Sequence, residues 1–575
     1  MILRATAPVV VLAGYIAVLV WLTWPLGAHL GTHLANTLIV CRTDIPYIAW
    51  TLAWQSHALA ADPAHYLDAN IYWPAPHALL FGDPGLSALP FFAPVFLATG
   101  NPALAINVVF LLCLALTATC FHAVVRRWTG SHAAGIVAGA VFLVDPWGVW
   151  RFFPWAPSYT VLLGFPLLVY LTSRPNPSWR RALVLVPLIV FQALANLVYL
   201  AATVFPPLVV LAVARLARPA TRTAGVRLAA ALGLALVVMA PIYVAYFAVR
   251  SANPALHDQS MWTARPDSPA LAGIPVAPIG GIPRIATRVP EDLVRRSAPT
   301  WIAVTTLAVV VLGIFARLAR RREPGAPGQA WRHAWLWTAM GFAMATPVVT
   351  LFGSAPLRLP YFVALEHLVP FVPDTIRDFS RLGIAAMIGL ALVAGLAFAE
   401  IAAWLVARGR GRLVPIAAAL VVVLLAVEYD VPERHRFEIA PAIDGRSTVM
   451  EALRAGRGPV LELPVGWQGT QAWPHARAMY RSIFYWRPLL NGYSSYWPTG
   501  WPARMQLAMR LPERDALATL RRETGLASLI VDTAYVDAGT RAAWLALATA
   551  GGRDGLRLVV RDGDLLLFAV GDAPS

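Results

Sequence analysis

The sequence contains no lysine and few charged residues of any kind. All 46 basic residues are therefore arginine, set against only 30 acidic residues, for a formal net charge of +16. Charged residues make up 13% of the 575 residues, against about 25% in a typical soluble domain. With 58% hydrophobic residues, such a chain could not cover its own core in water. The composition therefore excludes a soluble enzyme and a disordered chain, and it indicates an integral membrane protein.

Cysteine is also scarce. Cys41, Cys113 and Cys120 show no paired spacing, which excludes a cysteine-based zinc site and gives no disulfide framework. The sequence has no glycine-rich nucleotide motif and no serine-hydrolase or kinase signature. Its arginines lie mostly between apolar runs, so the positive-inside rule explains the basic balance better than nucleic-acid binding does. We expect a lipid bilayer, and no nucleic acid, as a partner.

Long apolar runs are what the sequence has in abundance. One of them contains Glu400, for which the sequence indicates no partner. A shorter apolar segment, 87–99, contains two prolines, and we predict that it lies at or dips into the membrane surface. Eleven runs are predicted to be membrane spans, near residues 8–26, 103–125, 132–150, 157–173, 182–197, 199–216, 228–249, 299–317, 333–353, 383–407 and 413–429.

The arginines assign a side of the membrane to each loop. If the amino end is cytoplasmic and the spans alternate, the clustered arginines fall on the inside, as the positive-inside rule requires. We therefore predict a multi-pass membrane protein with its amino end in the cytoplasm and its carboxyl end outside. The inner-loop arginines are Arg126, Arg127, Arg174, Arg180, Arg181, Arg215, Arg218, Arg222, Arg227, Arg317, Arg320, Arg321, Arg322, Arg408, Arg410 and Arg412.

From about Val431 charged residues become frequent and no further span is predicted. The predicted fold class is an α-helical polytopic membrane protein with a small α/β domain. The membrane domain covers residues 1–430, with about 11 helices and a large first outer loop at 27–102. The α/β domain follows at 431–575 and is predicted to be extracytoplasmic. Its predicted elements are strands at 459–465 and 526–532, helices at 513–525 and 538–552, and a hairpin at 556–570 that turns at Asp562-Gly563.

The first outer loop holds the leading candidate for catalysis. Asp44, with Pro46 just after it, is typical of a helix start. A carboxylate beside an aromatic wall at a membrane surface could activate a hydroxyl nucleophile. The alternative is that Asp44 caps the helix and the aromatic residues form an interfacial belt. The predicted wall of the substrate cavity is one stripe of this helix, at spacings of three, four and three: Tyr47, Trp50, Trp54 and His57.

A second carboxylate, Asp83, follows in the same loop, and His77 is a further candidate for the cavity. Asp83-Pro84-Gly85 is also a plausible turn, which is the structural alternative for Asp83. A divalent metal ion held by Asp44, Asp83 and a histidine is one hypothesis. Scattered surface histidines are the other, because no HExxH or comparable ligand spacing is present.

Two arginines near the last predicted spans are candidates for phosphate binding. Arg377 and Arg381 are four residues apart and would share one face of a helix. Arginine suits phosphate because its guanidinium group forms bidentate hydrogen bonds. The alternative is that both arginines snorkel and pair with Asp374 and Asp378.

The carboxyl-terminal domain contains a dense aromatic stretch between Trp473 and Trp501. Flat aromatic faces with flanking polar groups suit sugar stacking, and Tyr480, Trp486 and Tyr493 are the candidates for it. The same side chains suit packing of this domain onto the membrane domain, which is the alternative.

This organisation resembles the GT-C superfamily of polytopic membrane glycosyltransferases, near the protein mannosyltransferase and aminoarabinose transferase branch. The resemblance is to bacterial members, and it implies a place in the bacterial cytoplasmic membrane and a polyprenyl-phosphate-linked sugar donor. It also implies a first-loop acidic residue at Asp44, a second acidic residue at Asp83, and donor-phosphate arginines at Arg377 and Arg381. Thr43-Asp44 offers one carboxylate where many relatives have a pair. The segments that carry the resemblance include TDIPYIAWTLAWQSHALAADPAHYLDANIYWPAP, NPALAINVVFLL, LELPVGW, MYRSIFYWRPLLNGYSSYWP and LIVD.

The sequence thus predicts a glycosyltransferase that moves a sugar from a polyprenyl-phosphate donor to an envelope glycan, lipid or protein outside the membrane. No cofactor is implied beyond the divalent ion named above. Two alternatives stay open: a transporter or flippase for a lipid-linked glycan, and a non-catalytic envelope protein that binds glycan. The sequence shows neither the repeated halves and broken helices that often mark transporters nor a cluster of mid-span charges.

Overall fold

The protein was analysed as a computed structural model of the chain. The structure describes residues 2–37, 40–144, 153–174, 178–253, 302–320, 327–345, 379–428, 437–466 and 472–571, together with the short stretches 348–349, 357–358, 360, 362–363, 367 and 376.

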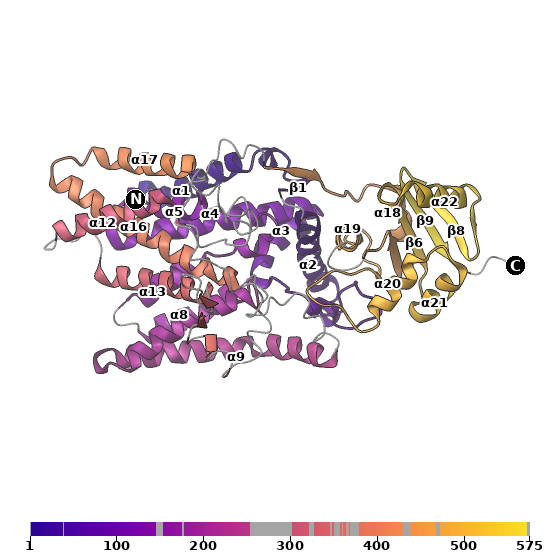
Figure 1. Ribbon diagram of the computed structural model, residues 1–575, viewed down its shortest axis with the longest axis horizontal. Coiled ribbons are helices and arrows are strands. Elements are labelled where there is room, and N and C mark those ends of the chain that lie inside the picture. Colours follow the sequence, from indigo (N-terminus) through magenta and orange to yellow (C-terminus); the bar gives the residue numbers. More distant parts are fainter. Residues whose placement is uncertain are drawn as a thin grey trace.

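A bundle of long helices forms one end of the molecule (Figure 1). Each of the eleven predicted runs contains one of these helices or most of one. Their bounds are α1 Ile2–Leu22, α4 Pro102–Thr129, α5 His132–Val144, α6 Gly164–Thr172, α7 Trp179–Ala193, α8 Tyr199–Leu216, α9 Arg222–Ala252, α12 Val304–Ala319, α13 Gly328–Ala345, α16 Ile384–Ala407 and α17 Leu413–Glu428.

Four helical stretches among the described residues are long and apolar enough to cross a membrane. These are Pro102–Thr129, Tyr199–Leu216, Pro219–Ala252 and Arg381–Ala407. The other apolar helices of the bundle are shorter. The structure therefore confirms a multi-helix apolar bundle, and the number of eleven spans stays a prediction.

The centre of the bundle is α16, which is buried along most of its length and packs against α5, α12 and α13. Glycine permits the closest of these contacts, because a Cβ added at Gly341 would lie 1.9 Å from the backbone nitrogen of Ala386. Small residues have this role in membrane helix packing. Glu400 is fully buried in α16 and has a partner that the sequence did not indicate, since Arg317 of α12 donates a hydrogen bond to its carboxylate.

Arginines from different predicted inner loops meet at helix α6, which contains both Tyr170 and Thr172. Arg127 and Arg174 both contact the hydroxyl of Tyr170. Arg215 donates a hydrogen bond to the carbonyl oxygen of Thr172. Loops that were predicted to lie on one side of the membrane therefore meet in the structure.

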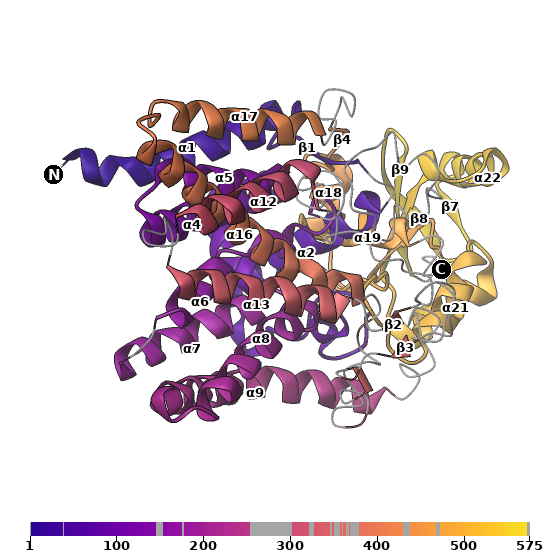
Figure 2. The ribbon, with the colours of Figure 1, turned by 60° about the vertical axis from the view of Figure 1, so that its left-hand side comes forward.

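The first outer loop contributes α2 (Cys41–Ala61) and α3 (Leu89–Thr99). Helix α3 has 11 residues, and its position at the membrane surface stays a prediction. Figures 1 and 2 place α2 between the bundle and the carboxyl-terminal part of the chain.

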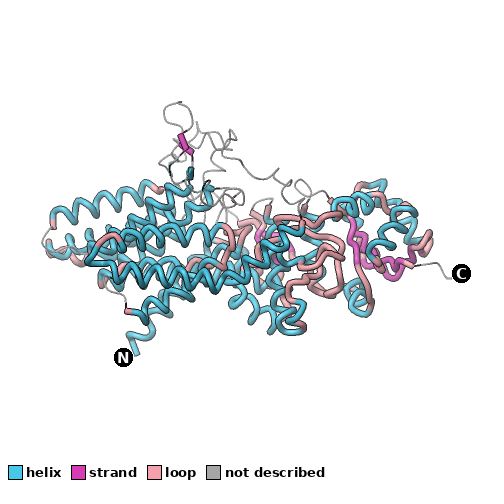
Figure 3. The backbone as a smooth tube through the Cα atoms, turned by 90° about the horizontal axis from the view of Figure 1, so that it is seen from below, coloured by secondary structure: helices cyan, strands magenta, loops and turns pink. Residues whose placement is uncertain are grey.

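That carboxyl-terminal part, here called the α/β region (residues 437–571), contains a five-stranded sheet at the far end of the molecule from the bundle (Figure 3). Strands β5 and β6 are parallel and the remaining pairs are antiparallel. Both predicted strands, both predicted helices and the hairpin are confirmed. The sheet order is β5-β6-β9-β8-β7, with bounds Val460–Leu463, Ser528–Asp532, Leu565–Val570, Leu556–Asp562 and Gly552–Arg553.

Five helices accompany this sheet: α18 Thr448–Ala455, α19 Trp473–Ser482, α20 Trp501–Met509, α21 Arg514–Thr524 and α22 Ala538–Thr549. Helix α21 ends as predicted at Gly525, whose φ of +68° is the left-handed conformation that glycine adopts without strain. A short antiparallel pair joins the α/β region to the first outer loop, because β1 (His33–Ala35) lies beside β4 (Ile439–Pro441).

Candidate functional site

The aromatic stripe of α2 faces the α/β region. The rings of His57 and Trp486 are stacked with centroids 4.2 Å apart, and Tyr493 meets Tyr47 edge-on at 5.5 Å. Trp54 also contacts Trp486 edge-on at 5.9 Å. The structure therefore confirms that the predicted stripe is one face of a helix, and the rings of Tyr47, Trp54 and His57 on it contact the α/β region.

Hydrogen bonds fix the two tryptophans of the stripe. The indole N–H of Trp50, which is 1% exposed, donates to the side-chain oxygen of Asn70 at 3.0 Å. That of Trp54 donates to the carbonyl oxygen of Tyr66, also at 3.0 Å. Both indole groups thus attach α2, the helix that carries Asp44, to the segment that follows it in the first outer loop.

Asp44 lies in the first turn of α2, but it is not the cap. The helix begins at Cys41 with Val40 in the capping position, so the expectation that Asp44 starts or caps the helix is wrong. Its side chain is half-buried, and its Oδ1 accepts a hydrogen bond of 2.7 Å from the hydroxyl of Tyr493. These two residues are 449 positions apart in the sequence.

Asp83 forms the predicted turn and a long-range contact as well. Its Oδ1 accepts the backbone N–H of Gly85 at 2.9 Å, and its Oδ2 accepts that of Leu197 at 2.7 Å. Gly85 has a φ of +57°, as such a turn requires. Burial raises the pKa of the Asp83 carboxyl to about 6, although both backbone hydrogen bonds act to lower it.

Tyr47 lies between the two acidic residues. A Cβ added at Gly82, the neighbour of Asp83, would lie 1.9 Å from the Tyr47 hydroxyl oxygen. Burial raises the pKa of the Tyr47 phenol, and the charges of both Asp83 and Asp44 act in the same direction. Asp44 and Asp83 therefore both act electrostatically on the same phenol group.

Arg381 lies among aromatic rings at the amino end of α16. Its guanidinium group is 4.8 Å from the ring centre of Tyr199 and 5.5 Å from that of Trp155. It also forms a hydrogen bond with the side chain of Tyr159, and the charge of Asp83 acts on that same hydroxyl. Arg381 and Asp83 thus share a neighbour, whereas Arg377 lies outside the described residues.

The other predicted site residues are placed differently. His77 is exposed, with 52% of its side chain accessible, and its ring nitrogen lies 3.2 Å from Asp68. Tyr480 is 1% exposed and packs edge-on against Phe484, so its ring face is covered by protein and the expectation that it stacks on a sugar is wrong. Trp486 is half-buried, and His57 occupies one of its faces.

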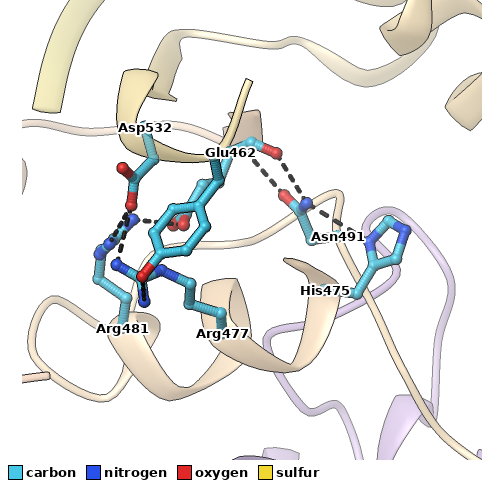
Figure 4. Close-up of polar contacts among 7 residues, drawn as sticks. Glu462, His475, Arg477, Arg481, Asn491 and Asp532 are labelled. Atoms are coloured by element: carbon cyan, nitrogen blue, oxygen red, sulfur yellow. Dashed lines mark hydrogen bonds and ion pairs between the residues drawn. The ribbon is translucent and has the colours of Figure 1, made fainter. Parts of the chain in front are cut away.

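A buried network of charged side chains fixes α19 to the carboxyl ends of the parallel strands β5 and β6. Arg481 is 2% exposed and donates to Glu462 of β5 and, at 2.9 Å, to Asp532 of β6. Arg477 donates to the same Asp532 oxygen at 3.0 Å (Figure 4). Burial raises the pKa of the Glu462 carboxyl, which the two arginines act to lower. Within this network each buried charge has a partner of opposite charge, which offsets the cost of removing the charges from water.

Asn491 extends this network towards His475. Its side chain accepts the backbone N–H of Glu462 at 2.8 Å and donates to the carbonyl oxygen of the same residue at 2.9 Å. His475 is fully buried, and burial lowers its pKa to about 4. Its Nε2 lies 2.7 Å from the carbonyl oxygen of Gly466 (Figure 4 shows the side chain beside Asn491). The ring is therefore neutral near pH 7 and has a structural role.

Sequence reasoning missed Tyr159 and Tyr199, which contact Arg381. Neither residue stands out in a motif, and only the packing of segments that are far apart in the chain brings them to the arginine. The contacts of Asn70 with Trp50, Ser482 and Arg487 likewise could not be inferred from the local sequence.

Asp44 and Asp83 by themselves offer a divalent metal ion few ligands in this arrangement. Hard cations take about six oxygen ligands, whereas both oxygens of Asp83 already accept backbone N–H groups and Asp44 accepts a hydroxyl. Within the described ranges, no three histidine, cysteine or acidic side chains are grouped so that they could hold a metal ion.

Comparison with solved structures identifies the fold. The arabinofuranosyltransferase AftD from Mycobacteria matches 98% of this chain with a TM-score of 0.56 and 15% identity. ArnT from Cupriavidus metallidurans, solved bound to undecaprenyl phosphate, matches 98% of both chains with a TM-score of 0.46 and 13% identity. No protein-family model and no curated protein matches the sequence.

The chain therefore shares its fold with a solved arabinofuranosyltransferase, and this likeness agrees with the fold that the sequence resemblance predicted. It covers 40% of the length of AftD.

Proposed function

We propose that the protein is a membrane glycosyltransferase that transfers a sugar from a polyprenyl-phosphate donor to an acceptor hydroxyl on the outer face of the cytoplasmic membrane. The observation that carries this proposal is the position of Asp44, Asp83 and Arg381. Asp44 accepts a hydrogen bond from Tyr493, and the charges of both acidic residues act on the phenol of Tyr47. Arg381 forms a hydrogen bond with Tyr159, on which the charge of Asp83 also acts. The fold shared with AftD, an arabinofuranosyltransferase, supports the same class of reaction.

Asp44 would act as the general base. It would take the proton from the acceptor hydroxyl while the hydroxyl oxygen attacks the anomeric carbon of the donor sugar. The bond between that carbon and the phosphate oxygen breaks, and its electron pair leaves with the lipid phosphate. Asp83 suits this role less well, because both of its oxygens accept backbone N–H groups and hold a turn in place.

Arg381 would stabilise the leaving phosphate. Guanidinium groups bind phosphate through two parallel hydrogen bonds, and the Tyr199 and Trp155 rings orient this side chain. Arg377 is proposed as a second phosphate ligand on the basis of the sequence alone. An acceptor from the cell envelope, whether glycan, lipid or protein, completes the proposed reaction.

The test uses the purified full chain in lipid nanodiscs. Labelled undecaprenyl-phosphate arabinose, mannose and aminoarabinose serve as donors, and envelope extract from a deletion strain serves as the acceptor. We expect label to pass from at least one donor to the extract, and we expect the glycan profile of the deletion strain to lack the product. No transfer from any donor, together with an unchanged profile, would contradict the proposal.

A further inference from the structure

We infer that Tyr493, which belongs to the α/β region, is a positioning residue that holds the Asp44 carboxylate in its reactive orientation. The inference rests on the proposed function, because it assigns a task to a residue of that same site. It makes the α/β region a part of the active site and not merely an appended domain.

The first observation is the contact itself. The Tyr493 hydroxyl donates to Oδ1 of Asp44 at 2.7 Å, a short hydrogen bond of the kind that carboxylates form. The Tyr493 ring lies edge-on to Tyr47, one helical turn further along α2. The side chain therefore touches α2 at two points, through its hydroxyl and through its ring.

The second observation is the way in which the backbone around Tyr493 is held from both sides. Asn491 forms two hydrogen bonds with the backbone of Glu462 in the sheet. On the other side, its carbonyl oxygen accepts the backbone N–H of Tyr72 in the first outer loop at 3.1 Å. Segment 491–494 is thus fixed to the sheet and to the first outer loop at the same point.

The next residues continue this attachment. Gly492 packs against the Tyr72 ring so closely that an added Cβ would lie 2.3 Å from two ring carbons. The Ser494 hydroxyl lies 2.9 Å from the Tyr72 hydroxyl. Tyr493 therefore stands between two anchored neighbours, and its position depends on both parts of the molecule.

The chemical consequence concerns rotation of the carboxylate. The last torsion of an aspartate side chain is broad, so an unrestrained carboxylate samples many orientations. A hydroxyl that holds Oδ1 restricts this rotation and fixes the direction in which Oδ2 is presented. Misplacement of a catalytic group by about 1 Å can cost roughly 100-fold in rate, so the loss of this contact should act on the chemical step.

The experiment compares Tyr493→Phe with Tyr535→Phe in the full chain, using whichever labelled donor the unaltered protein accepts. Tyr493→Phe keeps the ring on Tyr47 and removes only the hydroxyl. Tyr535 is a matched control, since its hydroxyl accepts a hydrogen bond from Arg477 in the same region and is outside the proposed catalytic machinery. We expect Tyr493→Phe to lower kcat roughly 10- to 100-fold with KM changed by less than about twofold, and Tyr535→Phe to leave both unchanged.

A double-mutant cycle then separates positioning from general destabilisation. If Tyr493 acts through Asp44, Tyr493→Phe should cause no further loss of rate in an Asp44→Asn background, because residues that act as a unit are not additive. An equal loss in both backgrounds, or a normal kcat in Tyr493→Phe, would overturn the inference while leaving the glycosyltransferase intact. No transfer by the unaltered protein would contradict the proposed function and this inference together.

Discussion

At the scale of single residues, the two side chains of greatest chemical interest depend on aromatic neighbours. The Asp44 carboxylate accepts a hydrogen bond from Tyr493, and the Arg381 guanidinium group lies over the rings of Tyr199 and Trp155. Aromatic rings bury these charged groups in part and hold them in place. A substitution that keeps the size of the side chain but changes its charge or its hydrogen bonds can therefore show whether the residue acts through its chemistry or through its packing.

Asp44→Asn is expected to reduce transfer by roughly 10²–10⁴-fold, because asparagine cannot take a proton from the acceptor. The thermal stability should change little, since the amide oxygen of asparagine can still accept the Tyr493 hydroxyl. The measurement is label transfer by the purified variant beside its melting temperature. Asp62→Asn is the control, because Asp62 lies on the same loop with 59% of its side chain exposed. Near-normal transfer by Asp44→Asn would move the base elsewhere, and Asp83 would be the next candidate.

Arg381→Lys is expected to keep the positive charge and still lose about 1.5–3 kcal/mol of transition-state stabilisation, because lysine cannot bind phosphate in the bidentate manner. Initial rates with the labelled donor measure this loss. Arg553→Lys provides the comparison, since the Arg553 side chain is 80% exposed in the α/β region. If Arg381→Lys and Arg553→Lys retain the same activity, Arg381 has only a packing role.

At the scale of elements, helix α19 connects the sheet to α2. It packs against α2, and its Arg477 and Arg481 pair with acidic residues at the carboxyl ends of β5 and β6. The charged network therefore fixes the helix on which the first outer loop rests.

Arg481→Met should destabilise the α/β region by about 3–5 kcal/mol, because two buried carboxylates would lose their shared partner. Limited proteolysis against temperature would detect cleavage within residues 437–571 before cleavage of the bundle. Arg553→Met, at an exposed position, should leave the cleavage pattern as it is. Equal resistance of the two variants would show that the network adds little to stability.

At the scale of the whole molecule, the structure separates two ends. Arginines of different predicted inner loops meet at α6 in the bundle, and the α/β region lies at the opposite end from the α16–α17 turn (Figure 1). The positive-inside rule predicts that the α/β region lies outside the membrane, and this orientation stays a prediction.

A reporter that is active only outside the cytoplasm should be active when fused after Ser575 and silent when inserted at Gly409. Gly409 is suited to an insertion because it lies exposed in the turn between α16 and α17. Activity on intact cells, normalised to the amount of protein, is the measurement. The reverse pair of results would contradict both the predicted orientation and an outer active site.

The sequence by itself determined the elements. Apolar runs of sufficient length predict the helices of the bundle, and alternating patterns, Gly525 and Asp562-Gly563 predict the strands, a helix end and the hairpin of the α/β region. Helical spacing also placed Tyr47, Trp50, Trp54 and His57 on one face. These features depend on neighbours within a few residues, so a local pattern is enough to predict them.

Only the tertiary structure decided the partners. It paired Asp44 with Tyr493, Glu400 with Arg317 and Arg381 with Tyr159, and it buried Tyr480 where a sugar could not reach its ring. It also showed that α2 begins at Cys41, so that Asp44 does not cap it. Each of the three pairs joins side chains that are far apart in the chain. Such contacts depend on how whole helices and the sheet pack against one another, and no local spacing encodes that packing.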